Sequence, residues 1–320
     1  MDETKLRGLP VLVTGGSGFI GSHLVDALAR HGARVRVLDD LSTGRPENLE
    51  SVRGSIEFVQ GDIRDEDTCR RACTGVRALF HLAALGSVPR SMMDPTTTLH
   101  VNVQGTANVF DAARRAGVER VIYASSSSVY GDSERLPKRE GEEGRPLSPY
   151  ALSKAMGERL AETFEHVYQL RCIGLRYFNV FGPRQDPRGP YAAVVPLFFS
   201  AYAKGLAPRI HGDGTQSRDF TYVDDAVNAN LLALMAPESS CGGAYNVAGG
   251  SRTTVNELAA LIREEMEGGP NPVHGPARPG DVPHSFADLE LVREVMCYEP
   301  RTSLRAGLKA VAAWYRGEAA

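Results

Sequence analysis

Three regularly spaced glycines constrain what this chain can fold into more than any other feature of its sequence. Gly15, Gly18 and Gly21 follow a short apolar run at residues 9–14 and lead into a helical pattern that ends before Gly32. Such a turn brings the backbone close to a ligand and leaves the N–H groups and the dipole of the helix N-terminus free to attract an anion. The spacing is one residue wider than the commonest dinucleotide fingerprint, but the physical requirements are the same. The pattern therefore predicts a strand–turn–helix unit that binds the pyrophosphate of a dinucleotide.

Short apolar runs alternate with helical patterns through the first 181 residues. Further strands are expected at residues 34–38, 56–59, 78–82, 120–124 and 172–177, and long helices at residues 96–116 and 150–170. This alternation is typical of parallel βαβ units, and it predicts an α/β fold with a Rossmann-like, doubly wound parallel sheet.

Glycine and proline become frequent after Phe181, and the strand–helix rhythm breaks down. Helical patterns recur at residues 194–204, 224–235, 255–266 and 303–315. We therefore expect residues 1–181 to form an NAD-binding domain, to which later segments can return. Residues 182–320 are expected to form a smaller α/β lobe over the carboxyl edge of the sheet, where open α/β sheets bind ligands.

Composition excludes several classes of partner. The net charge is −3 and the basic residues are scattered, so neither nucleic acid nor an anionic membrane is expected to bind. No stretch approaches the roughly 20 apolar residues that span a bilayer. The five cysteines have irregular spacing, and free thiols in a cytoplasmic protein explain them better than a metal pair at Cys69 and Cys73. No metal site is predicted.

Asp39 indicates which dinucleotide binds. It lies at the end of the second strand, 18 residues after Gly21, where it can accept hydrogen bonds from ribose hydroxyls. Its charge would repel a 2′-phosphate, which favours NAD over NADP, although Arg45 nearby would weaken that preference. Asp62 either meets the adenine or shapes a turn, and Asn102 is either a ligand or a buried tie to a strand.

Tyr150 and Lys154 suggest acid–base catalysis. Residues four apart share one face of a helix, so an ammonium would lie beside a phenol. We expect that cation to lower the pKa of Tyr150 and make it a usable general base. The same spacing also occurs on solvent-exposed helices, and it gains weight from four serines at 125–128, one of them 24 residues before Tyr150.

Together these features resemble the extended short-chain dehydrogenase/reductases, and most closely their nucleotide-sugar 4-epimerases. The resemblance spans essentially the whole chain. Its specific stretches are residues 86–91, 175–182, 212–214, 217–220, 245–247 and 278–281.

The resemblance implies an NAD-dependent 4-epimerase of UDP-sugars, with Ser126, Tyr150 and Lys154 as catalytic residues. Ser126 would polarise the C4 hydroxyl, Tyr150 would exchange its proton, and Lys154 would hold the nicotinamide ribose. The implied cofactor-binding residues are Gly15, Gly18, Phe19, Ile20, Asp39, Asp40, Ser42, Thr43, Gly44, Asp62, Ile63, Leu82, Ala83, Ala84, Tyr150, Lys154 and Tyr177. The implied substrate-binding residues are Ser87, Ser126, Ser127, Ser128, Tyr150, Asn179, Val195, Arg218, Arg278, Asp281 and Ser285.

Two positions bear on the reaction and on the sugar. Relatives that dehydrate their sugars carry an acidic pair where this chain has Ser127 and Ser128, so 4,6-dehydration is not expected. Ser285 stands where the family forms the wall facing the C2 substituent, and a serine leaves room for an acetamido group. We therefore expect UDP-GlcNAc and UDP-GalNAc as substrates, with UDP-Glc and UDP-Gal also admitted.

Other readings remain open. A uronate 4-epimerase would need donors for the C6 carboxylate, such as Arg90, Arg188 or His284, while Asp186 would oppose it. A decarboxylase, a net dehydrogenase or a silent NAD-binding protein are further alternatives. The resemblance also implies a homodimer formed through the helices at 96–116 and 150–170.

Overall fold

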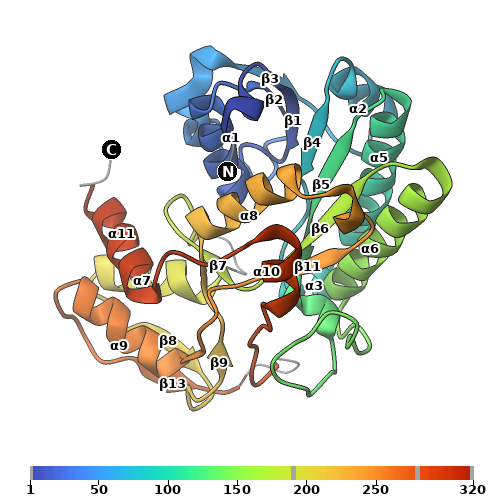
Figure 1. Cartoon of the computed structure of the whole chain (residues 1–320). Helices are drawn as coiled ribbons and strands as arrows, with labels where there is room; N and C mark the ends of the chain where they lie inside the picture. Colours follow the sequence, from blue (N-terminus) through green and yellow to red (C-terminus); the bar gives the residue numbers. More distant parts are fainter. Residues whose placement is uncertain (1–2, 189–191, 278–281, 318–320) are drawn as a thin grey trace.

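A seven-stranded parallel sheet forms the centre of the molecule (Figure 1). The computed structural model describes residues 3–188, 192–277 and 282–317. In spatial order the strands are β11 (Ala244–Val247), β6 (Cys172–Tyr177), β5 (Arg120–Ser126), β4 (Ala78–His81), β1 (Pro10–Thr14), β2 (Arg34–Asp39) and β3 (Ile56–Gln60). The strand order reverses between β1 and β4, and ligands of open α/β sheets bind at such a reversal. The predicted Rossmann-like α/β fold is confirmed.

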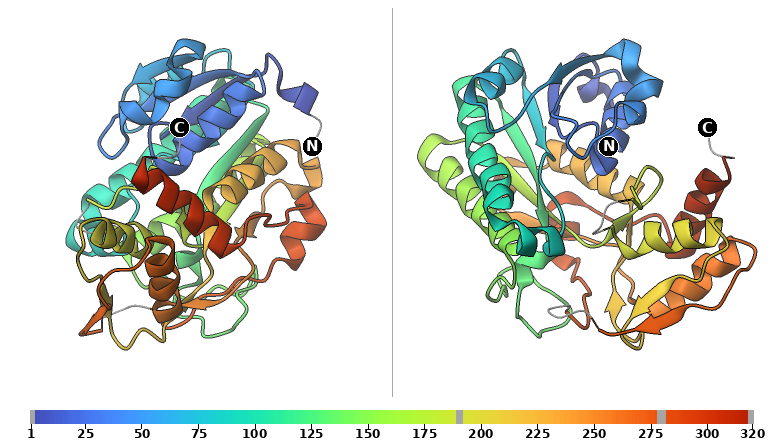
Figure 2. Two further views of the ribbon diagram at one scale, coloured as in Figure 1. Left: turned by 90° about the vertical axis from the view of Figure 1, so that its left-hand side faces the viewer. Right: turned by 180° about the vertical axis from the view of Figure 1, so that it is seen from behind.

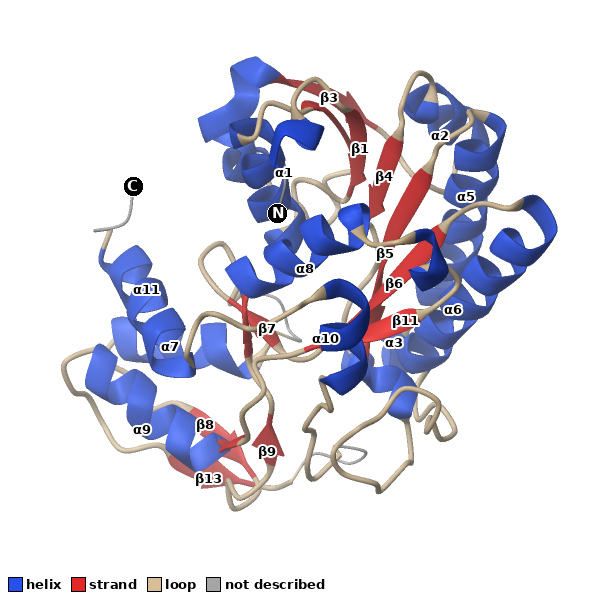
Figure 3. Cartoon of the chain, viewed as in Figure 1, coloured by secondary structure: helices blue, strands red, loops and turns tan. Residues whose placement is uncertain are grey.

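Helices cover both faces of this sheet (Figure 3). On one face α1 (Phe19–Arg30), α8 (Val223–Met235) and α10 (Glu290–Met296) bury their apolar sides in one core. On the other face α2 (Glu66–Cys73), α5 (Thr106–Arg115) and α6 (Pro149–Tyr168) share a second core around Phe110. The inner strands β1, β4, β5 and β6 are almost wholly buried, as expected for parallel strands covered on both faces, whereas the edge strand β3 is largely exposed.

The helix predicted at residues 96–116 is interrupted in the structure. After α3 (Val88–Met93), the chain forms α4 (Pro95–Leu99), a π-helical turn η3 (His100–Gly105) and then α5. Asn102 lies in this turn, and its carbonyl accepts a hydrogen bond from the Thr106 hydroxyl at 2.6 Å. Single π-turns of this kind are frequent at functional sites.

A smaller lobe stands apart from the sheet (Figures 1 and 2). Its helices are α7 (Val194–Ala203), α9 (Val255–Glu265) and α11 (Leu304–Arg316), and their apolar sides form a third core. Its short strands pair as β8 (Arg209–His211) with β13 (Val273–Gly275), and β9 (Ser217–Arg218) with β12 (Thr253–Thr254). A further pair, β7 (Val180–Phe181) with β10 (Thr221–Tyr222), lies where the chain passes from sheet to lobe.

Two segments after residue 181 return to the sheet. β11 pairs with β6 in parallel, and α8 packs on the same face as α1. The chain completes its described elements with the short helical turns η1 (Glu3–Leu6), η2 (Pro46–Ser55), η4 (Ser127–Tyr130) and η5 (Glu238–Ser240). The division into residues 1–181 and 182–320 therefore remains a prediction, because the chain crosses from the lobe back to the sheet after residue 181.

Within the described ranges, no helix combines the length and apolarity needed to cross a bilayer. In the same residues no group of three or more His, Cys, Asp or Glu side chains is arranged to hold a metal ion. All five cysteines are unpaired thiols, as predicted, and three of them are buried: Cys69, Cys73 and Cys172.

Candidate active site

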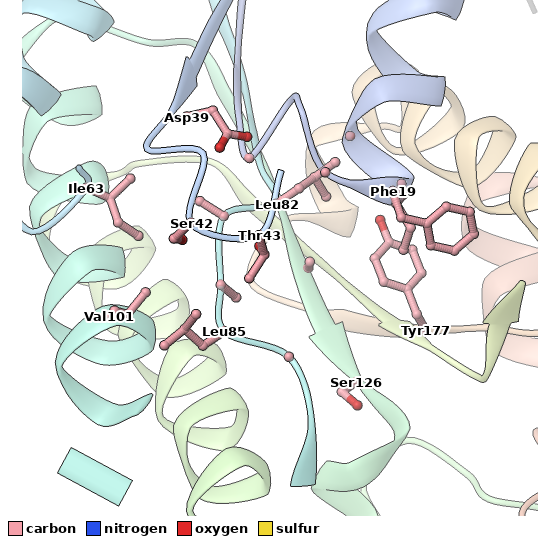
Figure 4. A pocket seen from close by; sticks show the side chains of 18 of the residues that line it. Phe19, Asp39, Ser42, Thr43, Ile63, Leu82, Leu85, Val101, Ser126 and Tyr177 are labelled. Atoms are coloured by element: carbon pink, nitrogen blue, oxygen red, sulfur yellow. The ribbon is translucent and has the colours of Figure 1, made fainter. Parts of the chain in front are cut away.

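A cleft of about 480 Å³ opens where the carboxyl ends of β1, β2, β4 and β5 meet (Figure 4). Figure 4 shows Asp39 toward one end of this cleft and Ser126 toward the other. A second cavity, of about 230 Å³, continues into the lobe between α7, β8 and β9. Asn179, Val180 and Gln185 line both spaces, so the two cavities meet at this segment.

Most of the predicted cofactor residues line the first cleft. They are Gly15, Gly18, Phe19, Ile20, Asp39, Asp40, Ser42, Thr43, Asp62, Ile63, Leu82, Ala83, Ala84, Tyr150, Lys154 and Tyr177. Gly44 does not line it and instead packs against the carboxylate of Asp39.

The glycine loop has the shape that a dinucleotide pyrophosphate requires. Gly15 has a φ of 71°, and a Cβ there would lie 2.7 Å from the backbone nitrogen of Ala83. A Cβ at Gly21 would lie 2.1 Å from the carbonyl oxygen of Gly15. Gly18 caps α1 without a side-chain hydrogen bond, so the N–H groups of the first turn are available to an anion. The residues present therefore fit NAD.

Asp39 is buried at the end of β2, on the wall of the cleft. Its two oxygens accept hydrogen bonds from the backbone N–H groups of Ser17 and Leu41, both at 2.9 Å. Burial raises the pKa of Asp39, and these two hydrogen bonds oppose the rise. The fixed carboxylate has lone pairs left, so its predicted hydrogen bonds to ribose hydroxyls are compatible with this geometry.

Two neighbouring predictions can be compared with the structure. Asp62 lines the cleft and also shapes its turn, because it accepts from the backbone N–H of Arg64 at 2.8 Å. Arg45 forms an ion pair with Asp186 rather than facing Asp39. This pair joins the loop after β2 to the segment that follows Gln185.

Ser126, Tyr150 and Lys154 converge on the cleft from two elements. Ser126 is the last residue of β5, and its hydroxyl accepts from the Ser128 hydroxyl at 3.0 Å. Tyr150 lies in the first turn of α6, which Ser148 caps by accepting from the Ala151 N–H at 3.1 Å. Lys154 Nζ donates to the Ala124 carbonyl at 2.8 Å and lies 5.9 Å from the centre of the Tyr150 ring. The spacing seen in the sequence thus brings an ammonium, a phenol and a hydroxyl together.

The prediction that the pKa of Tyr150 is lowered is wrong for the protein without a bound cofactor. Burial raises the pKa of Tyr150, and its hydrogen bond with Ser126 opposes the rise. Burial also lowers the pKa of Lys154 to about 8, with the charge of Glu158 acting in the opposite direction. Desolvation penalises both charged forms, and residue spacing alone does not reveal how deeply this helix face is covered.

Some of the predicted substrate residues line the two cavities, and others do not. Asn179 lines both cavities and donates through Nδ2 to the Asp219 carbonyl at 2.9 Å, while Val195 and Arg218 line the second cavity. Asn179 has a φ of 36°, an unusual backbone conformation for a non-glycine residue and one that concentrates at functional sites. Ser127 lines the first cleft. The walls of the two cavities do not include Ser87, Ser128 or Ser285. Arg278 and Asp281 lie outside the described residues.

Several lining residues were missed. Gln185 lines both cavities, and its Oε1 is buried without a hydrogen-bond partner in the described residues. Arg209, His211 and Gln216 line the second cavity beside Arg218. The short strand before Gly212 was the sequence feature that could have pointed to Arg209. Which way the Arg209 side chain faces depends on the pairing of β8, and the sequence does not show that pairing.

Asn102 proves to be a structural tie. Its side chain accepts from the Leu85 N–H at 2.8 Å and donates to the Leu85 carbonyl at 3.1 Å and to Ser153 Oγ at 3.0 Å. It joins the segment after β4 to α6, and both donors of its amide nitrogen are used within the protein.

Comparisons with known proteins agree with this geometry. The profile of the NAD dependent epimerase/dehydratase family matches residues 11–248. The chain is 40% identical over 316 residues to UDP-glucose 4-epimerase of Mycolicibacterium smegmatis, covering 96% of this chain and 98% of that protein. It is 34% identical over 335 residues to UDP-glucuronate 4-epimerase 4 of Arabidopsis thaliana, covering 97% and 76%. The structure of UDP-N-acetylglucosamine 4-epimerase from Methanobrevibacter ruminantium, in complex with UDP-N-acetylmuramic acid, superposes with a TM-score of 0.93 at 38% identity, covering 98% and 99%.

Proposed function

Because the chain belongs to the NAD-dependent epimerase/dehydratase family, we propose that it is an isomerase that inverts C4 of a UDP-sugar, with NAD as its cofactor. The observation that carries this proposal is the convergence of Ser126, Tyr150 and Lys154 on the cleft that fits the dinucleotide. The second cavity adds Arg209 and Arg218, and guanidinium groups suit a diphosphate because they offer paired donors.

The residues of this chain have distinct roles in the proposed reaction. NAD, held by the glycine loop and Asp39, would supply the hydride acceptor and donor for C4 of the sugar. The Tyr150 oxygen would remove the proton of the C4 hydroxyl in the first half-reaction and give it back in the second. Because the hydride is returned as well, the reaction has no net redox change. Ser126 holds the same sugar oxygen through a hydrogen bond. The hydrogen bond with Ser126 opposes the burial penalty on the Tyr150 phenolate, and the Lys154 ammonium, 5.9 Å from the centre of the Tyr150 ring, adds a positive charge beside it.

The side chains after Ser126 support epimerisation over dehydration. Ser127 and Ser128 begin the short helical turn after β5. A hydroxyl at these positions is a poor general acid or base near neutral pH, because it neither gains nor loses a proton there. Oxidation and re-reduction at one carbon are therefore the complete proposed reaction.

For the sugar we propose UDP-GlcNAc and UDP-GalNAc, with UDP-Glc and UDP-Gal as further substrates. The support comes from relatives named as acting on UDP-glucose and on UDP-N-acetylglucosamine. Ser285 lies outside the walls of both cavities and adds no support from the geometry. A uronate is less well supported. Asp186 is an acidic residue beside Gln185, Arg188 pairs with Asp186 at 3.2 Å, and neither Arg90 nor His284 lines the two cavities.

NMR of the purified protein with NAD and each of UDP-GlcNAc, UDP-Glc and UDP-GlcA separates these alternatives. We expect the C4 epimer of UDP-GlcNAc to accumulate to a constant ratio, without net NADH and without CO₂. Accumulation of NADH would indicate a dehydrogenase, and loss of C6 would indicate a decarboxylase. No conversion of any substrate would favour a silent NAD-binding protein.

Tyr150→Phe tests the assignment of the acid/base. Removing a general acid/base side chain costs about 10²–10⁴-fold in rate, while NAD should still bind. Tyr168→Phe, on the half-exposed end of the same helix, is the matched control and should retain full activity. Interconversion by Y150F within a few-fold of wild type would show that another group carries the proton.

The sequence predicts a homodimer through the helices at 96–116 and 150–170. Of these we retain α6, and we propose that it forms the dimer surface together with α3, which lies before residue 96. Leu152, Met156 and Val167 are exposed along α6, and Met92 and Met93 are 61% and 76% exposed on α3, which contacts α6. Light scattering of the purified protein should give twice the chain mass, and the double variant L152E/M156E should give the mass of one chain. A wild-type protein that is monomeric at micromolar concentration contradicts this assignment.

A further inference from the structure

Lys154 lies between two ionisable residues of its own helix, Tyr150 and Glu158, each four positions away. Of the groups on neighbouring strands, His81 on β4 is neutral, because burial lowers its pKa to about 3. Burial raises the pKa of Tyr123 on β5 and of Tyr177 on β6, so both phenols are also neutral. Arg176 on β6 adds a positive charge at this face and forms ion pairs with Glu158 and Glu143.

Glu158 is held by three hydrogen bonds. Its Oε1 accepts from the Ser125 hydroxyl and from Arg176 Nε at 2.9 Å, and its Oε2 accepts from Arg176 Nη2 at 2.8 Å. The side chains of Glu158 and Arg176 are only 14% and 7% exposed. These bonds fix the carboxylate of Glu158 in one position. Lys154 lies one helical turn earlier in α6.

Ser125 connects this carboxylate to the catalytic groups. It stands between Ala124, whose carbonyl accepts from Lys154 Nζ, and Ser126, whose hydroxyl bonds to Tyr150. Glu158 thus binds the end of β5 at Ser125. The neighbours of Ser125 on either side contact Lys154 and Tyr150.

We propose that Glu158 is a positioning residue: it keeps the Lys154 ammonium charged at neutral pH and fixes the end of β5 against α6. The role in turnover rests on the proposed function, whereas the effect on the charge of Lys154 does not. The role differs from that of Glu143, which forms an ion pair with Arg176 Nη1 and, within the described residues, makes no hydrogen bond to Lys154 or Ser125.

Two opposing effects set the pKa of Lys154: burial disfavours the ammonium, and the charge of Glu158 favours it. Removing one nearby opposite charge shifts the pKa of a buried group by about 1 unit or more. In Glu158→Gln, Lys154 should therefore lose its proton about tenfold more readily, and the alkaline fall in activity should move to lower pH by the same interval.

The chain suits a direct titration because it has five lysines: Lys5, Lys138, Lys154, Lys204 and Lys309. In the NAD-free protein labelled with ¹³C-lysine, the Cε signal reports protonation of each amine, and a K154R variant assigns Lys154. We expect the Lys154 midpoint to fall by about 1 pH unit in E158Q and to stay near the wild-type value in E143Q. Both variants remove one carboxylate from Arg176, so a loss of thermal stability common to both reports on that ion pair alone.

A Lys154 midpoint that is unchanged in E158Q, or that moves equally in E143Q, overturns the proposal. Ser125→Ala separates the second role and stands in if E158Q does not fold: kcat should fall several-fold with the Lys154 midpoint unchanged, and an unaltered kcat removes the anchoring role. If the wild type epimerises no UDP-sugar, the titration still reads the charge of Lys154. A failure of the proposed function is therefore distinguishable from a failure of this inference.

Discussion

Replacing Gly21 by alanine should weaken NAD binding without unfolding the protein. The new Cβ would lie 2.1 Å from the Gly15 carbonyl oxygen and 2.9 Å from both Gly15 C and Gly16 Cα, all of them backbone atoms. An ordinary C···O contact is about 3.3 Å, so the glycine loop or α1 must move by roughly 1 Å. The helix cannot yield easily, because Leu24, Val25 and Leu28 anchor it with no measurable exposure. The loop must therefore move, and it is the loop that cradles the pyrophosphate.

The size of the effect follows from the hydrogen bonds at risk. A hydrogen bond to a charged group contributes about 1.5–3 kcal/mol, and a shift of this size forfeits about one such bond to the pyrophosphate. The Kd of NAD should then rise about 10- to 100-fold. Overpacking costs about 1–3 kcal/mol of stability, which is offset in part by the better helix propensity of alanine, by about 1 kcal/mol.

Calorimetric titration of the NAD-free protein measures this Kd, and two further glycines give a graded series. A Cβ at Gly18 would come no closer than 3.1 Å to another atom, and a Cβ at Gly54 would meet nothing within 4 Å. The loss of affinity should follow the order G21A, G18A, G54A, with G54A equal to wild type. An affinity of G21A within threefold of wild type would refute the reasoning, as would a reversed order.

Three more perturbations have expected outcomes. Burial lowers the pKa of His81 to about 3, so the folded state resists its protonation, and stability present above pH 6.5 is lost as the pH falls toward 3. From this residue the free energy of unfolding should drop by about 2 kcal/mol between pH 6.5 and 5, and denaturant titration of His81→Gln should show a smaller drop. Asp186→Asn breaks the half-exposed pair with Arg45 and should speed NAD release up to about fivefold at low salt, as measured by stopped-flow displacement; an unchanged rate there removes the pair's role in retention. Ser285→Tyr should lower kcat/KM for UDP-GlcNAc by at least about tenfold relative to UDP-Glc if this residue borders the C2 substituent, and an equal loss for both sugars would place it elsewhere.

The sequence predicted those features that depend on a few neighbouring residues. Gly15 and Gly21 specify a turn and a close approach, and Asp39 follows from the length of the βα unit, so all three could be placed in advance. Tyr150 and Lys154 needed only helical periodicity to be brought together. Each of these arguments is local, and the structure keeps the geometry they predicted.

Features that depend on tertiary packing could not be predicted in the same way. The pKa of Tyr150 depends on how deeply neighbouring elements bury the phenol, which no spacing reveals. Glu158 and Arg176 are 18 residues apart and meet only because α6 packs beside β6. The sequence left two interpretations of Asn102, a ligand of the cofactor or a buried tie to a strand. The structure decides between them because Leu85 and Ser153 bond to its amide.

The return of β11 to the sheet has a consequence for how this protein can be divided. β6 is buried along its full length, and β11 is the neighbour that satisfies its outer row of N–H and C=O groups. A fragment that stopped at residue 181 would present β6 as a bare edge strand, stripped also of the apolar cover from α8. Exposed edges of this kind pair with other chains and aggregate. The dinucleotide-binding half therefore depends on residues from the second half of the chain for its solubility, and we expect the two halves to fold and unfold as one cooperative unit.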